Sequence, residues 1–388
     1  MRSIQRFLVR WENCIVLALI LATHLAIYYF TGIRRGSDTS YYVTSSQYLR
    51  EHAFNLVTLF QNVPHSVHYA TTILFFSFGG PKIFPVLNVL LSFSALWLFS
   101  RLLKQLLPGN VFLRLSIFGF FLVNTEVVRW NYYLLSDGVL INLVLLTLFA
   151  LLSNRPASSW MYLAVAPLLA FTRPTAVAFF IPILLYCLWS KARFKLLITL
   201  TTLVMCLGLR FQLGASQQYS PSFLRPFHVG LVTGHLIADP GFNYKIESPF
   251  VIDQSEITGR ENTWELLSKF PFYSMEYLSK KAITYAFPVY PYFSTKHNLF
   301  NGIYFTVLYL WILIGSIWIL SLFTQRKLNL KSNPHLPRLF LFVFTFAGFV
   351  VLHTFSILDS EARYLAPWIP MAILAGVSLI GLPQWNSR

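Results

Sequence analysis

Long apolar stretches, separated by shorter polar segments, follow one another along most of the chain. An apolar stretch of roughly 20 residues crosses a bilayer as a helix. Pro174 divides two of these stretches, because proline ends one helix and is tolerated in the first turn of the next. The pattern predicts an all-α polytopic membrane protein with about ten transmembrane helices. They are expected at 13–31, 82–100, 108–124, 136–152, 158–171, 174–190, 196–212, 301–323, 337–356 and 364–381.

The composition agrees with this pattern. Of the 388 residues 56% are hydrophobic and only 11% are charged, whereas soluble domains carry about 25% charged residues. This excludes a soluble enzyme, a disordered regulator and a disulfide scaffold. Cys14, Cys187 and Cys206 lie inside apolar runs and are expected to be small buried hydrophobes. The basic start of the chain precedes an apolar run without a small-residue cleavage site, which favours a retained first span over a signal peptide.

Lysine and arginine near the span ends predict the orientation, since they gather on the cytoplasmic side. With both termini cytoplasmic, the inner segments and the border residues Arg114 and Arg338 together hold half of the 30 basic residues but only Glu12 of the 14 acidic ones. The net charge of +16 is therefore assigned to topology and to attraction by anionic lipids. Membrane lipids are the expected partners, and nucleic acid is not. The inner segments are 1–12, 101–107, 153–157, 191–195, 324–336 and 382–388.

The longer polar segments then lie outside the membrane, so chemistry is expected on that face. A short apolar piece at 67–79 is expected to lie in the interface or to re-enter. Amphipathic stretches at Trp264–Phe270 and Tyr273–Tyr285 indicate a small helical subdomain. The expected organisation is a transmembrane module at 1–212 with a first outer loop at 32–81, an extracytoplasmic subdomain at 213–300, and transmembrane helices at 301–388.

Two outer carboxylates are candidates for catalysis or binding, because ionisable groups near a bilayer are costly. Asp38 lies beside Tyr41 and Tyr42 and is a candidate base for a substrate hydroxyl. The alternative, favoured by sequence alone, is that Ser37 or Asp38 caps the following helix. Asp137 opens another span, where it either faces the same cavity or, together with Ser136, caps that helix.

Basic residues supply the other candidates. Arg173 stands at a helix junction, where it either extends to the interface or holds a phosphate by bidentate hydrogen bonds. At the mouth of the last span, Glu361 and Arg363 either pair with each other or, with Tyr364, bind a substrate. His65 and His68 have metal-ligand spacing, but no third ligand is apparent, so no metal site is expected.

In their order, spacing and shared outer location these segments resemble the GT-C superfamily of integral-membrane glycosyltransferases. The resemblance covers nearly the whole chain and is closest to bacterial members related to the protein O-mannosyltransferase and aminoarabinose-transferase groups. It rests on Gly36-Ser37-Asp38 with Tyr42, Leu135-Ser136-Asp137, Phe171-Thr172-Arg173-Pro174, Glu361-Ala362-Arg363-Tyr364-Leu365-Ala366-Pro367, and Leu267–Pro291 with Lys280-Lys281.

The resemblance implies transfer of a sugar from a polyprenyl-phosphate donor to a lipid, glycan or protein acceptor, outside a bacterial inner membrane. Asp38 would be the general base of an inverting displacement, and Arg173 or Arg363 would hold the donor phosphate. Lys280 and Lys281 match the phosphate-binding residues less closely. The remaining substrate-binding candidates are Asp137, Glu361, Tyr41, Tyr42 and Tyr364. Ser37-Asp38 lacks the adjacent acid pair of some members, so a divalent metal is not supported and no cofactor is expected.

Other functions stay open at this point. A lipid-linked oligosaccharide ligase or polymerase would also bind polyprenyl phosphates from outside. An acyltransferase would need a membrane-embedded histidine, for which His24 and His353 are isolated candidates. A transporter or flippase would need ionisable groups at the bilayer midplane, whereas the predicted spans are nearly free of charge. A non-enzymatic scaffold predicts that Asp38→Asn changes nothing.

Overall fold

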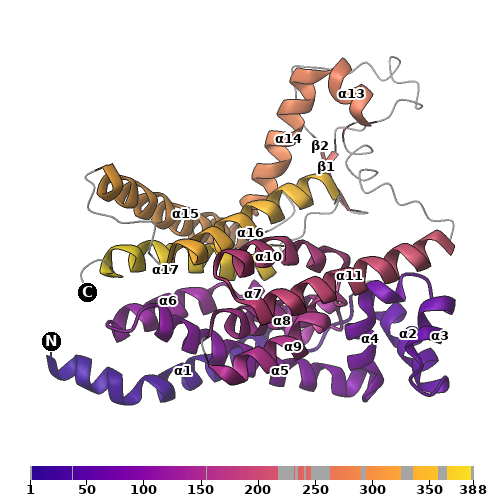
Figure 1. The fold of residues 1–388 in the computed structure, drawn as a ribbon, viewed down its shortest axis with the longest axis horizontal. Coiled ribbons are helices and arrows are strands. Elements are labelled where there is room, and N and C mark those ends of the chain that lie inside the picture. Colours follow the sequence, from indigo (N-terminus) through magenta and orange to yellow (C-terminus); the bar gives the residue numbers. More distant parts are fainter. Residues whose placement is uncertain are drawn as a thin grey trace. The chain divides into compact units, whose positions relative to one another are not determined.

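The computed structural model describes a largely helical chain that divides into two compact units (Figure 1). The first unit comprises Met1–Gln218, Ile312–Thr345 and Ala366–Arg388, and the second comprises Tyr219–Trp311 and Phe346–Leu365. Each is described by itself. The described residues are 2–36, 38–153, 155–216, 231, 235–239, 242–245, 263–289, 294–324, 335–356 and 365–385.

Helices and short 3-10 turns (η) account for the regular structure described in the first unit. They are α1 (Arg2–Thr31), α2 (Thr39–Glu51), α3 (Leu56–Asn62), η1 (Ser66–Tyr69), α4 (Ala70–Ser77), α5 (Gly80–Leu106), α6 (Val111–Val123), α7 (Glu126–Arg129), η2 (Trp130–Tyr132), α8 (Ser136–Leu152), α9 (Pro156–Ala170), η3 (Pro174–Phe179), α10 (Phe180–Trp189), α11 (Arg193–Ser216), η6 (Ala366–Trp368) and α17 (Ile369–Trp385).

The second unit mixes helices with one strand pair. Asp239 of β1 pairs with Phe242 of β2 in an antiparallel ladder, so the subdomain predicted to be helical also contains one short strand pair. The amphipathic stretches expected between 263 and 286 are helical, as predicted. The elements are β1 (His235–Asp239), β2 (Phe242–Lys245), α13 (Thr263–Lys269) and α14 (Pro271–Ala286), while α15 (Thr295–Thr324) and α16 (His335–Ser356) run from one unit into the other.

The apolar helices are those of a membrane protein. Each of the ten expected segments overlaps a helix, but among the described residues only three helices are long and apolar enough to cross a membrane. These three are Phe7–Thr31, Gly80–Leu106 and Thr295–Leu322. A fourth is added if Val111–Val123 and Glu126–Tyr132, which meet at a 65° bend, form one broken span. The other apolar helices are too short, or not apolar enough, to count as candidate membrane spans.

The segment expected as the first outer loop, 32–81, is itself mostly helical. It contains α2, α3, η1 and α4. The short apolar piece within it packs on neighbouring helices of the same unit, since α4 lies against both α2 and α5. Ile73 and Phe76 of α4 are fully buried in this contact region.

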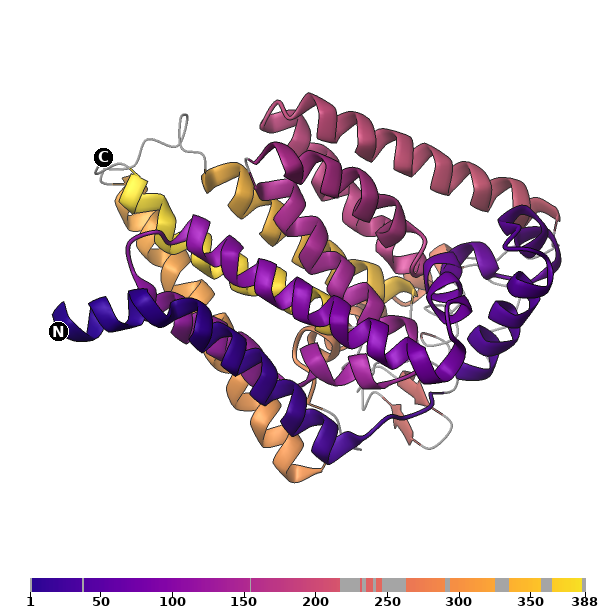
Figure 2. The ribbon, with the colours of Figure 1, turned by 90° about the horizontal axis from the view of Figure 1, so that it is seen from below.

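Helix α8 forms the core of the first unit. Every residue from Ser136 to Leu152 is buried, because α5 lies along one side of α8 and α9 along another. Figure 2 shows these helices side by side, with α11 packed beyond α9. A helix that is apolar and enclosed on all sides is typical of the centre of a bundle.

Four polar side chains bind one another inside this apolar core. Asn142 Nδ2 of α8 donates to Asn131 Oδ1 of η2 at 2.7 Å and to Asn88 Oδ1 of α5 at 3.1 Å. Asn131 Nδ2 in turn donates to Ser92 Oγ of α5 at 3.1 Å. Buried amides are tolerated in apolar surroundings only when they are hydrogen-bonded. The network therefore fixes η2, the turn that precedes α8, to both helices.

Close packing around this network generates the first prediction, for Gly138→Ala. A Cβ at Gly138 would lie 2.4 Å from Asn88 Nδ2 and 2.7 Å from the carbonyl oxygen of Trp130. Because the second atom belongs to the backbone, the added methyl forces a shift, and we expect a destabilisation of ~1–3 kcal/mol. The measurement is thermal unfolding of the purified chain in detergent.

Gly119→Ala is the matched control, since a Cβ at Gly119 of α6 meets nothing within 4 Å. Alanine raises helix propensity by ~0.5–1 kcal/mol, so this variant should unfold at the same temperature as the wild type or higher. An equal loss of stability in both variants would contradict the packing described at Gly138.

Candidate functional site

Two chain segments far apart in sequence meet where α1 ends and α8 begins. Arg34 N donates to the carbonyl oxygen of Tyr132 at 2.9 Å, and Leu134 N donates to the carbonyl oxygen of Arg34 at 2.9 Å. The two hydrogen bonds make a short parallel β-bridge between Arg34 and Tyr133. The bridge places the segment that carries Asp38 beside the segment that carries Asp137.

Two residues of the first segment tighten this approach. Thr39 Oγ1 accepts from Gly36 N at 2.8 Å and donates to the carbonyl oxygen of Leu134 at 3.0 Å. A Cβ at Gly36 would lie 2.6 Å from Leu135 Cδ1. The glycine of the Gly36-Ser37-Asp38 segment is therefore explained by close contact with the start of α8.

The segment before α8 is anchored on its other side by α1. Tyr132 Oη donates to the carbonyl oxygen of His24 at 3.0 Å and lies 2.9 Å from His24 Nδ1. One turn earlier, Glu126 accepts from Arg129 Nη1 and from Trp130 Nε1, each at 3.0 Å. These contacts hold the backbone that leads into Asp137.

The third segment is the junction between α9 and η3. Thr71 N of α4 donates to the carbonyl oxygen of Phe171 at 3.1 Å, and Thr71 Oγ1 donates to that of Leu168 at 2.7 Å. Helix α4 thereby holds the end of α9, next to Arg173. We refer to the described residues 34–36, 38–42, 132–137 and 171–173 together as the three-loop cluster.

A buried ion pair joins two parts of the three-loop cluster. Arg173 Nη1 donates to Asp137 Oδ1, and the side chains are 9% and 1% exposed, respectively. The interpretation of Arg173 as a residue that extends to the interface is thus wrong. Asp137 lies in the first turn of α8, where the helix dipole favours a negative charge. Neither Ser136 nor Asp137 caps α8, since Leu135 occupies the cap position without a side-chain hydrogen bond.

Tyr42 connects the first segment to this pair. Its hydroxyl donates to Ser136 Oγ at 3.1 Å, and the residue is 1% exposed. Burial raises the pKa of Tyr42, an effect opposed by the positive charge of Arg173. The ring of Tyr42 lies 5.7 Å from that of Tyr41 and 5.6 Å from that of Tyr69, between centroids. Both predicted tyrosines therefore belong to one aromatic group beside the ion pair.

Asp38 stands at the edge of the three-loop cluster. It directly precedes Thr39, and its carbonyl oxygen accepts from Tyr42 N at 3.2 Å. The side chain is half-buried, and although Asp38 occupies the cap position of α2, it makes no capping hydrogen bond there. The capping interpretation is therefore wrong for Asp38, and Ser37 lies outside the described residues.

The two candidate lysines belong to α14, in the second unit. Lys280 Nζ pairs with Glu276 Oε1 at 2.7 Å, and its side chain is 40% exposed. Lys281 is fully buried, with Nζ 5.5 Å from the ring centroid of Tyr277. Burial lowers the pKa of Lys281 to about 7. The remaining candidates, Glu361, Arg363 and Tyr364, lie outside the described residues.

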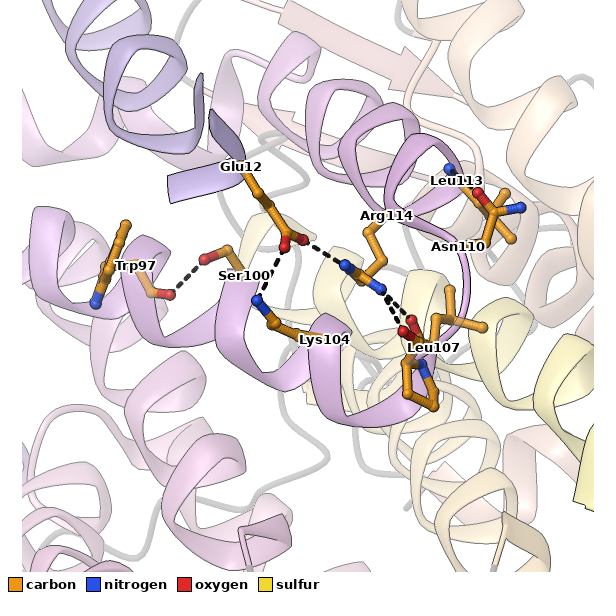
Figure 3. Close-up of polar contacts among 9 residues, drawn as sticks. Glu12, Trp97, Ser100, Lys104, Leu107, Asn110, Leu113 and Arg114 are labelled. Carbon is orange, nitrogen blue, oxygen red and sulfur yellow. Dashed lines mark hydrogen bonds and ion pairs between the residues drawn. The ribbon is translucent and has the colours of Figure 1, made fainter. Parts of the chain in front are cut away.

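A second charged cluster was not predicted as a site. Glu12 of α1 accepts from Lys104 Nζ of α5 at 3.0 Å and from Arg114 Nε of α6 at 2.7 Å (Figure 3). Arg114 Nη1 also donates to the carbonyl oxygen of Leu107, which ends α5, at 2.6 Å. The sequence contained one indication of this cluster, because Glu12 is the sole acidic residue expected on the inner face.

His65 and His68 lie with their ring centroids 6.3 Å apart. Within the part of the chain that the structure describes, no group of three histidine, cysteine, aspartate or glutamate side chains is arranged to hold a metal ion.

The chain matches no protein-family model, no curated protein and no solved structure.

The ion pair between Asp137 and Arg173 generates the second prediction. Removing one partner leaves a buried charge uncompensated, which costs ~3–5 kcal/mol. We therefore expect Asp137→Asn and Arg173→Gln each to lower the unfolding temperature strongly, and the double variant to lose much less than the sum of both. Thermal unfolding of the four proteins in detergent measures this coupling.

Lys280→Gln serves as the control for that cycle, because the Lys280–Glu276 pair is partly exposed and such pairs contribute only ~0–1 kcal/mol. Simple additivity of the Asp137 and Arg173 variants would show that the two side chains do not stabilise each other.

The lowered pKa of Lys281 generates the third prediction. Below pH 7 its ammonium group is charged in both the folded and the unfolded chain, so burial destabilises the wild type. Between about pH 7 and 10 the folded chain loses the proton while the unfolded chain, with a pKa of about 10.4, keeps it. The stability of the wild type relative to Lys281→Met should therefore rise with pH across this window.

Unfolding temperatures of both proteins between pH 6 and 10 measure this difference. Lys280→Met is the control, since Lys280 is the neighbouring lysine of the same helix and its side chain is 40% exposed. A flat difference between wild type and Lys281→Met would mean that Lys281 stays charged in the folded chain.

Proposed function

We propose that the chain is a membrane glycosyltransferase of the GT-C type. It transfers a sugar from a polyprenyl-phosphate donor to an acceptor on the extracytoplasmic face of a bacterial inner membrane. In this proposal the chain crosses the membrane about ten times, with the shorter apolar helices completing the set. Both termini are cytoplasmic, and the three-loop cluster faces the outside.

The observation that carries the proposal is the convergence of three separate segments at one end of the helices. Asp137 and Arg173, 36 residues apart, form a buried ion pair, and Tyr42 binds Ser136 beside it. Asp38 adjoins the same segments without serving as a cap for α2. Ionisable groups gathered near a membrane boundary favour a binding or catalytic role, because their burial is otherwise costly.

The Asp137–Arg173 ion pair is better suited to directional hydrogen bonding of a phosphate group than to long-range attraction of an anion. Asp137 compensates the charge of Arg173, so Arg173 contributes directed N–H groups in place of a net positive charge. One carboxylate oxygen holds Nη1, which orients the planar guanidinium. Arg363, Lys280 and Lys281 stay separate predictions for phosphate binding, apart from this pair. Glu361 and Tyr364 remain candidates for substrate contacts.

In the proposed reaction Asp38 accepts the proton of the acceptor hydroxyl as its oxygen attacks the anomeric carbon of the donor sugar. The bond from that carbon to the phosphate oxygen breaks, and negative charge develops on the leaving phosphate, where N–H donors stabilise it. Direct displacement inverts the anomeric configuration. No cofactor is needed, because the donor already carries its leaving group.

The position of the charges favours this function over transport. In the described part of the first unit, Arg114, which pairs with Glu12, lies in the first turn of α6, and Asp137, which pairs with Arg173, lies in the first turn of α8. Transporters place ionisable groups at the midplane, on broken helices. A lipid-linked oligosaccharide ligase or polymerase would share the donor chemistry, and the size of the transferred glycan distinguishes it from a glycosyltransferase.

The fourth prediction tests the base. Purified protein is incubated with a panel of labelled polyprenyl-phosphate sugars and membrane acceptors, and transferred label is counted. Asp38→Asn keeps the size of the side chain but removes the proton acceptor, so the turnover rate should fall by ~10²–10⁴-fold. Arg173→Lys should lower the rate by ~10²–10³-fold, because one ammonium group does not replace a planar guanidinium.

Glu51→Gln, at the exposed end of α2, is the control and should keep full activity. Unfolding temperatures are compared at the same time, so that a loss of structure is not mistaken for a loss of catalysis. Activity of Asp38→Asn equal to that of the wild type would exclude Asp38 as the base, and consumption of no donor in the panel would exclude the proposed reaction.

A further inference from the structure

A shallow polar hollow lies at the opposite end of α1 from the three-loop cluster. It lies beside residues 12–16 in the first half of α1, the end of α5 and the start of α6, and Figure 3 shows the polar contacts around it. Helix α1 contacts both α5 and α6, so three helices converge there. The polar residues that line the hollow are Glu12, Asn13, Ser100, Arg101, Lys104 and Arg114.

The hollow has an excess of positive charge. Arg101, Lys104 and Arg114 line it together with one carboxylate, that of Glu12. The side chain of Arg114 is 5% exposed. Its Nε donates to Glu12, and its Nη1 donates to the carbonyl oxygens of Leu107 and Pro108, which directly follow α5. This places the buried arginine in a structural role. The side chain of Lys104, in contrast, is 45% exposed although it also contacts Glu12.

Two accessible cations, half-buried Arg101 and exposed Lys104, therefore line a hollow whose helices α1 and α6 are joined by the buried Glu12–Arg114 ion pair. The guanidinium carbon of Arg101 lies 4.6 Å from the ring centroid of Trp97, which orients the Arg101 side chain. Ser100 and Asn13 add polar atoms beside the charges. A small anion that accepts several hydrogen bonds, such as a phosphate group, fits this set of donors.

The position along the helices identifies the source of the anion. The hollow lies at the ends of two candidate membrane spans, Phe7–Thr31 and Gly80–Leu106. Trp11, 44% exposed, precedes Glu12, and Trp97 lies one turn before Arg101. Tryptophan is enriched at the level of the lipid head groups, and basic pockets between spans at this level bind anionic head groups.

We propose that the hollow binds the phosphate of an anionic membrane phospholipid, with Arg101 and Lys104 contacting the phosphate oxygens. Exposed apolar side chains farther along the span, including Leu17 and Leu21 of α1, lie against its acyl chains. The bound lipid links α1 to α5 at their membrane boundary. This site is independent of the catalytic proposal and lies at the other end of α1 from Asp38.

The experiment is a lipid titration of the full purified chain in a neutral detergent. The unfolding temperature is followed while phosphatidylglycerol, phosphatidylcholine or inorganic phosphate is added at matched concentrations. A ligand that binds only the folded chain raises this temperature in a saturable way. We expect such a rise with phosphatidylglycerol alone, because phosphatidylcholine carries no net charge and free phosphate lacks acyl chains.

Three variants locate the site. Arg101→Gln leaves both ion pairs of Glu12 in place. It should raise the phosphatidylglycerol concentration needed for half-saturation by roughly fivefold, and Lys104→Gln should raise it by a similar factor. Lys82→Gln is the matched control, since Lys82 is exposed at the other end of α5. It should bind phosphatidylglycerol as the wild type does. Half-saturation is compared between variants, so a lower starting stability of Lys104→Gln does not affect the result.

Several outcomes would overturn the proposal. Equal stabilisation by phosphatidylcholine would show that the acyl chains alone bind. Equal stabilisation by inorganic phosphate would assign the hollow to a soluble anion. Unchanged half-saturation in Arg101→Gln, or the same weakening in Lys82→Gln, would place the lipid elsewhere on the chain.

Discussion

Polar side chains buried among apolar helices have to bind one another, and this constraint organises the first unit. Asn142 binds Asn131 and Asn88 in the core, and Asp137 binds Arg173 where α8 begins. Each buried partner would be costly alone. The contacts therefore select one arrangement of α5, α8 and η2, and with it the path of the chain into Asp137.

The same constraint gives the three-loop cluster its rigidity. Its backbone is held by hydrogen bonds between Arg34 and Tyr132 and between Leu134 and Arg34, while Thr71 holds the third segment. Asp38 lies at the edge of this framework, half-buried and outside the capping role. A carboxylate on a fixed backbone is what the proposed role of Asp38 as a general base requires.

Charge is distributed in a way that fits a protein acting on lipid-linked molecules. In the described part of the first unit, buried ion pairs occupy opposite ends of α1, through Glu12 at one end and the three-loop cluster at the other. The helices between them expose many large apolar side chains, which suit contact with acyl or polyprenyl chains. Both proposals use this arrangement, one at each end.

The sequence by itself predicted helices within all ten long apolar segments, because the apolar pattern of a helix is a local property. It determined the amphipathic helices α13 and α14, and it selected Asp137 and Arg173 as notable residues, but not as partners. Only the tertiary structure decided that these two pair across 36 residues, that Glu12 meets residues 92 and 102 positions away, and that Asp38 does not cap α2. Such contacts depend on which helix faces meet, and that follows from packing of the whole unit.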